Sequence, residues 1–166
     1  TSLATVWGFA ALVALWMCIV IGLPWQYSGA YEPSVLLSLV FTIWAADSGA
    51  YFVGKPLGRH KLMPSVSPGK SWEGLIGGAA CAAVVAYFLW GAALVWVGPL
   101  IAVLGTAGDL LESSWKRRNG LKDSGVIMPG HGGVMDRFDG FVLTAPVYFV
   151  LLSLLPFEFA LKAILP

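Results

Sequence analysis

The sequence carries little charge for its length. Only 11% of the 166 residues are Asp, Glu, Lys or Arg, whereas 58% are hydrophobic and the mean hydropathy is +0.79. Soluble domains carry roughly 25% charged residues, so this deficit, together with eight Trp, argues against a soluble domain and indicates an integral membrane protein. The net charge of +1 gives no argument for nucleic acid, and we expect no nucleic-acid partner.

The sequence has only two cysteines and no clear export signal. The two cysteines, Cys18 and Cys81, lie in apolar runs without a CxxC partner, which argues against a disulfide framework or a zinc cluster. We expect both to be small buried residues. The first apolar run lacks a preceding basic stretch and a clear cleavage site, so a signal peptide is not expected. Since the sequence starts with Thr1 rather than Met, we expect a fragment of a longer protein.

Long apolar runs dominate what the sequence does contain. A membrane-spanning helix needs about 20 predominantly apolar residues, and five segments approach that length: 3–23, 35–53, 72–97, 100–115 and 136–155. We expect loops at 54–71 and after 115, a turn at Gly98-Pro99, and an early end of the third helix at Gly91. The sequence predicts one all-α transmembrane domain over 1–166, comprising an N-terminal helix and loop (1–34), further helices (35–155) and a short tail (156–166).

Lys and Arg are concentrated in two of the connections. Nine of the ten lie in or beside the second-to-third and fourth-to-fifth connections, and the tenth is Lys162. With five spans, these two connections fall on the same side of the membrane. The positive-inside rule makes that side cytoplasmic, so we expect the N-terminus and a site at these helix ends to face the cytoplasm.

Carboxylates approach the same membrane boundary from three of the predicted helices. They are Asp47, Asp109, Glu112, Asp136 and Asp139. Asp109 and Glu112, three residues apart, share a helix face that Ser113 extends. The structural alternatives are packing ion pairs for Asp109 and Glu112 and a helix cap for Asp136. All five would repel one another without a cation, and oxygen ligands suit Mg²⁺, so we expect a magnesium site near these helix ends.

The fourth-to-fifth connection also supplies groups that suit phosphate. Its cations are Lys116, Arg117, Arg118 and Lys122. Arg suits bidentate contacts and Lys point-charge contacts, although membrane topology alone explains some of this charge. Topology does not explain the mixing with Asp123, His131 and the Gly132-Gly133 pair, whose backbone N–H groups can approach an anion closely. For His131 a general-base role and a hydrogen bond that shapes the glycine turn are both open, and we favour the second.

The loop at 54–71 contains a second candidate phosphate site. Gly69-Lys70-Ser71 resembles the end of a Walker A motif, but Pro64 stands where that motif requires glycine and no soluble βα unit precedes it, so we reject a P-loop. A Gly-Lys-Ser-Trp sequence at a helix start can still hold a phosphate on backbone N–H groups and Lys70. An N-cap at Ser71 with Trp72 as an interfacial anchor explains the same residues equally well.

Residues 113–139 hold many polar groups at fixed spacings. They are Ser113, Lys116-Arg117, Lys122-Asp123, Gly125, Pro129, His131-Gly132-Gly133, Asp136-Arg137 and Asp139. This pattern closely resembles the signature of phosphatidate cytidylyltransferases, also called CDP-diacylglycerol synthases. Trp115 and Met128 depart from it, but both stay apolar. Residues 46–51 and 67–74 are similar to upstream motifs of the same family, so the resemblance covers roughly residues 44–140.

The resemblance implies transfer of CMP from CTP to phosphatidic acid, giving CDP-diacylglycerol and pyrophosphate for phospholipid biosynthesis. It also implies Mg²⁺ with two metal ions, a homodimer, a location in the bacterial inner membrane or in organelle membranes, of which we expect the first, and a catalytic part at 35–155. The implied catalytic residues are Asp109, Asp136, Asp139, Lys122, Asp123 and His131, and the implied metal ligands are Asp109, Asp136 and Asp139. The implied substrate-binding residues are Lys70, Ser71, Ser113, Lys116, Arg117, Arg137, Gly132 and Gly133.

Two other functions fit parts of the pattern. A CTP-dependent polyprenol or dolichol kinase would use similar charged groups but release CDP rather than pyrophosphate. A cation transporter would also hold carboxylates in the membrane, but transporters tend to place ionisable groups near the midplane between discontinuous helices. Here the acids gather toward one side and share it with bases that suit phosphate, which favours the cytidylyltransferase.

Overall fold

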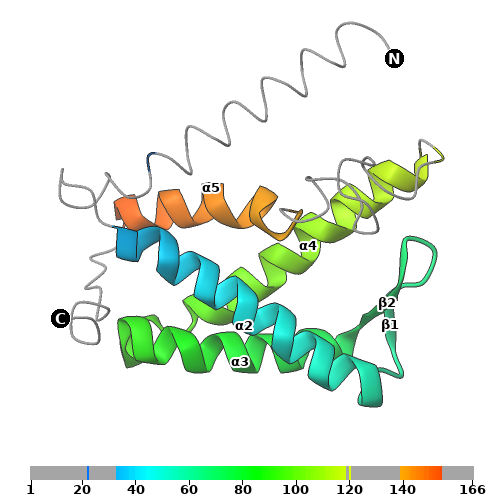
Figure 1. Cartoon of the computed structure of the whole chain (residues 1–166), viewed down its shortest axis with the longest axis horizontal. Coiled ribbons are helices and arrows are strands. Elements are labelled where there is room, and N and C mark those ends of the chain that lie inside the picture. Colours follow the sequence, from blue (N-terminus) through cyan, green and yellow to red (C-terminus); the bar gives the residue numbers. More distant parts are fainter. Residues whose placement is uncertain (1–21, 23–32, 119, 121–138, 155–166) are drawn as a thin grey trace, which may run out of the picture.

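The computed structural model describes residues 22, 33–118, 120 and 139–154, which form a helical bundle with a small hairpin at one end (Figure 1). The elements are α2 (Pro33–Leu57), β1 (Lys61–Met63), β2 (Ser67–Ser71), α3 (Trp72–Trp90), the 3-10 turn η1 (Ala92–Leu94), α4 (Val97–Arg118) and α5 (Asp139–Leu154). Four of the five predicted apolar segments coincide with α2, α3, α4 and α5. Apart from residue 22, the predicted first segment lies outside the described residues.

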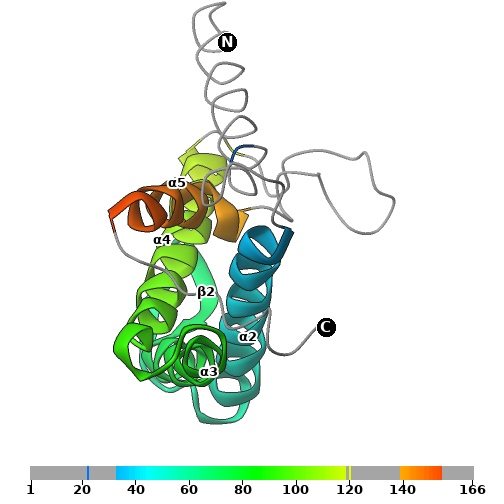
Figure 2. The same ribbon diagram turned by 90° about the vertical axis from the view of Figure 1, so that its left-hand side faces the viewer.

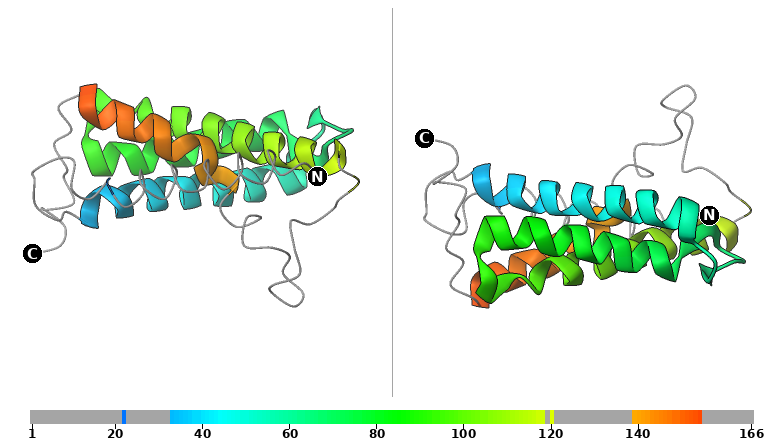
Figure 3. Two further views of the ribbon diagram at one scale, coloured as in Figure 1. Left: turned by 90° about the horizontal axis from the view of Figure 1, so that it is seen from above. Right: turned by 90° about the horizontal axis from the view of Figure 1, so that it is seen from below.

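The helices have the length and surface of membrane spans. Three stretches of the described residues are long and apolar enough to cross a bilayer: Pro33–Leu57, Trp72–Trp90 and Ala92–Arg118. The apolar part of α5, Asp139–Leu152, is shorter. Figures 2 and 3 show the four helices side by side. Large apolar side chains such as Phe52 and Phe88 are exposed on them. The prediction of an all-α integral membrane protein is therefore confirmed for the described residues.

Small residues allow the helices to approach closely. A Cβ atom added to Gly77 of α3 would collide with the Val53 side chain of α2, and one added to Gly98 of α4 would collide with the Ala82 backbone of α3. Membrane helices pack largely by such close van der Waals contact, because lipid tails are as apolar as the helix surfaces themselves. The glycines therefore fix how α2 and α4 lie against α3, and with them the residues that these helices carry.

The apolar core lies in the half of the bundle away from the hairpin. It contains Val35, Leu39, Ile43, Ala86, Leu89, Trp90, Val97, Ile101, Ala145, Tyr148 and Leu152. The Trp90 and Tyr148 rings pack with their centroids 5.9 Å apart. A polar contact also crosses the core, where the hydroxyls of Ser38 and Tyr148 lie 2.8 Å apart. This half holds α5 against α2, so that α5 begins beside the charged half of the bundle.

Helix α3 begins and ends where its capping residues stand. Ser71 has extended backbone angles (φ −134°, ψ 157°), and its hydroxyl accepts the N–H of Gly74 at 3.1 Å, as an N-cap does. At the other end Gly91 adopts φ +80°, a left-handed conformation that favours glycine, and its N–H donates to the Tyr87 carbonyl. Both the predicted N-cap and the predicted break at Gly91 are confirmed.

Three local predictions are wrong. Residues 54–71 are not simply a loop, because α2 continues to Leu57 and β1 pairs with β2. The Gly98-Pro99 pair lies within α4 rather than in a turn, because proline is tolerated in the first turn of a helix, where its missing N–H has no intrahelical acceptor. Cys81 is exposed rather than buried.

Candidate functional site

A cavity of about 610 Å³ opens where the hairpin meets the charged half of the bundle. Its lining residues come from α2, both hairpin strands, α3, α4 and the first turn of α5. They are Asp47, Ala50, Tyr51, Gly54, Lys55, Gly58, Lys61, Leu62, Gly69, Lys70, Ser71, Gly74, Leu75, Gly105, Thr106, Asp109, Asp139 and Gly140. Cavities of this size commonly hold small molecules or cofactors.

Three carboxylates form one wall of this cavity. Asp47 comes from α2, Asp109 from α4, and Asp139 from the first residue of α5. Helices α4 and α5 meet backbone to backbone here, because a Cβ added to Gly108 would lie 2.6 Å from the Asp139 carbonyl oxygen. Asp139 also stands at a helix N-terminus, where the helix dipole favours a carboxylate. The predicted convergence of acids from three helices is thus found for Asp47, Asp109 and Asp139.

Lys70 is the cation that contacts this acidic wall. Its Nζ lies 2.5 Å from Oδ2 of Asp109 and donates to the Thr106 carbonyl at 3.2 Å. The other carboxylate oxygen of Asp109, Oδ1, accepts the Ser113 hydroxyl at 3.1 Å. Asp109 is therefore held in a fixed orientation by groups on both of its oxygens. This arrangement joins two residues predicted from separate motifs, Lys70 and Ser113, through one carboxylate.

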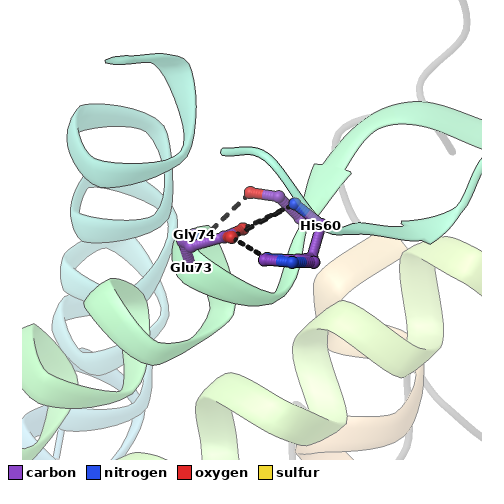
Figure 4. A network of polar contacts seen from close by, with 4 residues as sticks. His60, Glu73 and Gly74 are labelled. Atoms are coloured by element: carbon purple, nitrogen blue, oxygen red, sulfur yellow. Dashed lines mark hydrogen bonds and ion pairs between the residues drawn. The ribbon is translucent and has the colours of Figure 1, made fainter. Parts of the chain in front are cut away.

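The base of the hairpin is closed by His60 and Glu73 (Figure 4). The Glu73 carboxylate accepts the backbone N–H of His60 at 3.1 and 3.2 Å, and its Oε1 lies 2.6 Å from His60 Nδ1. Trp72 N–H donates to the His60 carbonyl at 2.9 Å. These contacts bring the two ends of segment 60–72 together, so Lys70 is presented to the cavity from a closed loop.

We predict that Glu73→Ala opens this loop. The substitution removes the acceptor for both His60 donors, so the hairpin base should separate more often and expose its backbone to proteases. Trypsin should cleave after Lys61 several times faster in the detergent-solubilised variant than in the unaltered protein. His60→Ala removes only the ring contact and keeps the backbone N–H that Glu73 also accepts. It should therefore have a smaller effect, and the double variant should be cleaved no faster than Glu73→Ala alone. Unchanged cleavage in Glu73→Ala would show that the contact does not hold the hairpin.

Other predicted site residues lie away from the cavity or outside the described part of the chain. Lys116 pairs with Glu112 at 3.2 Å, with both side chains only 9% exposed, and neither lines the cavity. Arg117 is exposed on the last turn of α4. The predicted residues that lie outside the described part are Lys122, Asp123, His131, Gly132, Gly133, Asp136 and Arg137. Their roles stay predictions.

The acidic wall suits a hard cation through its donor atoms. Within the described ranges, no three His, Cys, Asp or Glu side chains form a metal-ligand group by themselves. Mg²⁺ does not need such a group, since it is commonly bound by one or two carboxylates together with substrate phosphates and waters. Asp109 and Asp139 provide two carboxylates from adjacent helices on one cavity. The residues present therefore fit Mg²⁺, and the magnesium site stays a prediction.

The cavity includes functional candidates that the sequence motifs did not identify. Lys55 lines it with its Nζ 2.9 Å from the Tyr51 hydroxyl and 5.1 Å from the centre of that ring. Lys61 reaches the cavity from β1. The four-residue spacing of Tyr51 and Lys55 could have signalled their contact on a helix. Lys61 gave no such signal, because its position depends on the hairpin.

Comparisons with known proteins agree with one another. A family model described as the cytidylyltransferase family matches residues 2–155. A phosphatidate cytidylyltransferase of Bacillus subtilis (strain 168) is 40% identical over 157 residues, covering 89% of this chain and 58% of the relative. One of Staphylococcus aureus (strain COL) is 44% identical over 125 residues, covering 70% and 48%. The chain therefore spans about half the length of the curated relatives it matches.

Proposed function

The chain belongs to the cytidylyltransferase family, and from this we propose that it forms the catalytic part of a phosphatidate cytidylyltransferase. The reaction is transfer of CMP from CTP to phosphatidic acid, which yields CDP-diacylglycerol and pyrophosphate. The observation that carries the proposal is the cavity itself, where three carboxylates and Lys70 meet at the ends of apolar helices. A lipid headgroup and a water-soluble nucleotide can meet only near such a membrane boundary.

We also propose that this end faces the cytoplasm of a bacterial inner membrane. The described Lys and Arg residues lie at the hairpin end of the bundle, either between α2 and α3 or at the last turns of α2 and α4. They are Lys55, Arg59, Lys61, Lys70, Lys116, Arg117 and Arg118. Positive charge of this kind favours the cytoplasmic side. CTP is made in the cytoplasm, so this orientation would place the cavity on the side of its substrate.

The chemistry needs positioning and charge neutralisation more than a side-chain nucleophile. The phosphate monoester of phosphatidic acid is itself a competent nucleophile toward the α-phosphorus of CTP. Lys70 can bind a phosphate oxygen while the Thr106 carbonyl holds its ammonium group in place. Asp109 and Asp139, with Asp136 from the family signature, would hold Mg²⁺, which would neutralise charge that develops on the reacting phosphates.

One assay tests the proposed reaction. The purified protein, radiolabelled CTP and phosphatidic acid should give CDP-diacylglycerol and pyrophosphate, and chelation of Mg²⁺ with EDTA should stop formation of both. Release of CDP with a phosphorylated lipid would instead identify a polyprenol-type kinase. Cation flux into liposomes without nucleotide would identify a transporter. Neither alternative is favoured, because the relatives are named phosphatidate cytidylyltransferases. The expected homodimer is tested separately by the mass of the solubilised protein.

A further inference from the structure

The lysines that line the cavity differ in whether they are paired with a carboxylate. The carboxylates of the cavity are Asp47, Asp109 and Asp139, with Lys70 paired to Asp109. Its other two cations, Lys55 and Lys61, are exposed, and among the residues that the structure describes no carboxylate forms an ion pair with either. The proposed reaction brings together two anionic substrates. The question is which substrate the unpaired lysines bind and which one the paired Lys70 binds.

We propose that Lys55, with Lys61 beside the same cavity, binds the phosphate monoester headgroup of the lipid substrate; this rests on the proposed function. The lysine Nζ has three N–H donors, of which one is used by the Tyr51 hydroxyl. The remaining donors and the uncompensated charge suit a dianionic phosphate. Lys70, in contrast, is already paired with Asp109 of the acidic wall. A phosphate can bind there only together with a cation that neutralises the carboxylates.

The surroundings of Lys55 fit a lipid rather than a nucleotide. Tyr51 is 57% exposed, and the neighbouring Phe52 is 73% exposed and packs edge-on against it, with ring centroids 5.8 Å apart. Both rings lie within the span Pro33–Leu57, close to its charged end. Aromatic side chains at this level of a membrane protein sit where headgroups give way to acyl chains. A headgroup on Lys55 can therefore keep its acyl chains in the bilayer beside α2.

The assignment predicts that substitutions of Lys55 and Lys70 change the KM for different substrates. Lys55→Ala should raise the KM for phosphatidic acid about 10-fold, the loss expected when one charge-assisted hydrogen bond is removed. Its KM for CTP should stay within about 2-fold, whereas Lys70→Ala should raise the KM for CTP. Arg59→Ala is the matched control, because it removes one exposed charge from the same region but outside the cavity lining. A Lys55→Ala variant that raises the KM for CTP, or leaves both constants unchanged, would overturn the assignment.

A binding measurement tests the headgroup site without relying on the proposed reaction. Dioctanoyl phosphatidic acid should raise the melting temperature of the solubilised protein, and Lys55→Ala should lose that shift while Lys55→Arg keeps most of it. Dioctanoyl phosphatidylcholine, a diester without a free phosphate, should give no shift. This result would support the headgroup site even if no turnover were seen, in which case only the proposed function would fail. An equal shift with inorganic phosphate, or a full shift in Lys55→Ala, would overturn the lipid assignment.

Discussion

Asp109→Asn is expected to lower CDP-diacylglycerol formation by about 100- to 1,000-fold, the range seen when one preorganised electrostatic contact is removed from an active site. Asparagine has nearly the same shape, and its carbonyl oxygen can still accept the Ser113 hydroxyl that now bonds Oδ1. It cannot supply negative charge to Lys70 or to a metal ion. The loss should therefore appear in turnover, measured with radiolabelled CTP, while the melting temperature changes little.

Glu73→Gln is the matched control for Asp109→Asn. It removes one carboxylate charge at the same end of the bundle but outside the cavity lining, and glutamine keeps an oxygen acceptor for His60. Its turnover should stay within about 10-fold of the unaltered protein, consistent with the small contribution of exposed charge pairs. If Asp109→Asn retained full turnover, the acidic wall would not be the reaction centre.

Gly98→Ala is expected to give the largest loss of stability among single methyl additions in the described helices. The added Cβ would meet the carbonyl oxygen and carbon of Ala82 and the nitrogen of Ala83, which are backbone atoms that cannot rotate away. Helices α3 and α4 would have to separate, and overpacking of this kind costs roughly 1–3 kcal/mol or more. A lower melting temperature in detergent should be accompanied by weaker turnover, because α4 carries Asp109.

Gly105→Ala provides the comparison on the same helix. Its added Cβ would approach the Gly140 carbonyl oxygen at 3.7 Å, an ordinary contact. Replacing a glycine inside a helix by alanine is itself favourable by roughly 0.5–1 kcal/mol. The melting temperature of Gly105→Ala should therefore be equal or higher. If Gly105→Ala lowered the melting temperature as much as Gly98→Ala does, the effect of Gly98→Ala could not be assigned to the α3–α4 contact.

The sequence predicted the helices better than their connections. Apolar length alone locates α2, α3, α4 and α5 to within a few residues, because a bilayer leaves few other solutions for such segments. The hairpin was missed for a physical reason. Ser67-Pro68-Gly69-Lys70-Ser71 has little strand propensity, and its pairing with β1 depends on His60 contacting Trp72 and Glu73, which are more than ten residues away in the chain.

The site was predicted in part for a related reason. Carboxylates within apolar segments are conspicuous, so Asp109 and Asp139 were identified, and Asp47 was recognised as belonging with them. The direct contact between Lys70 and Asp109 was not predicted, because it requires the hairpin to fold back over α4. Lys116 looked like a phosphate ligand by its charge, but the structure pairs it with Glu112 one helical turn away. The pattern of charges in the sequence therefore indicates where a site lies. It does not predict which charged groups pair, because pairing depends on how the helices and the hairpin pack.

The buried hydroxyl groups of the core bear on how the nascent chain assembles. Thr42 and Thr144 each donate at 2.7 Å to a carbonyl one turn earlier in their own helix, so these groups are satisfied on insertion. Ser38 likewise donates to the Val35 carbonyl, which makes it the acceptor for Tyr148 on α5. That last bond forms only when α5 docks on α2. This hydroxyl pair is therefore a polar contact that depends on the correct packing of α5 against α2.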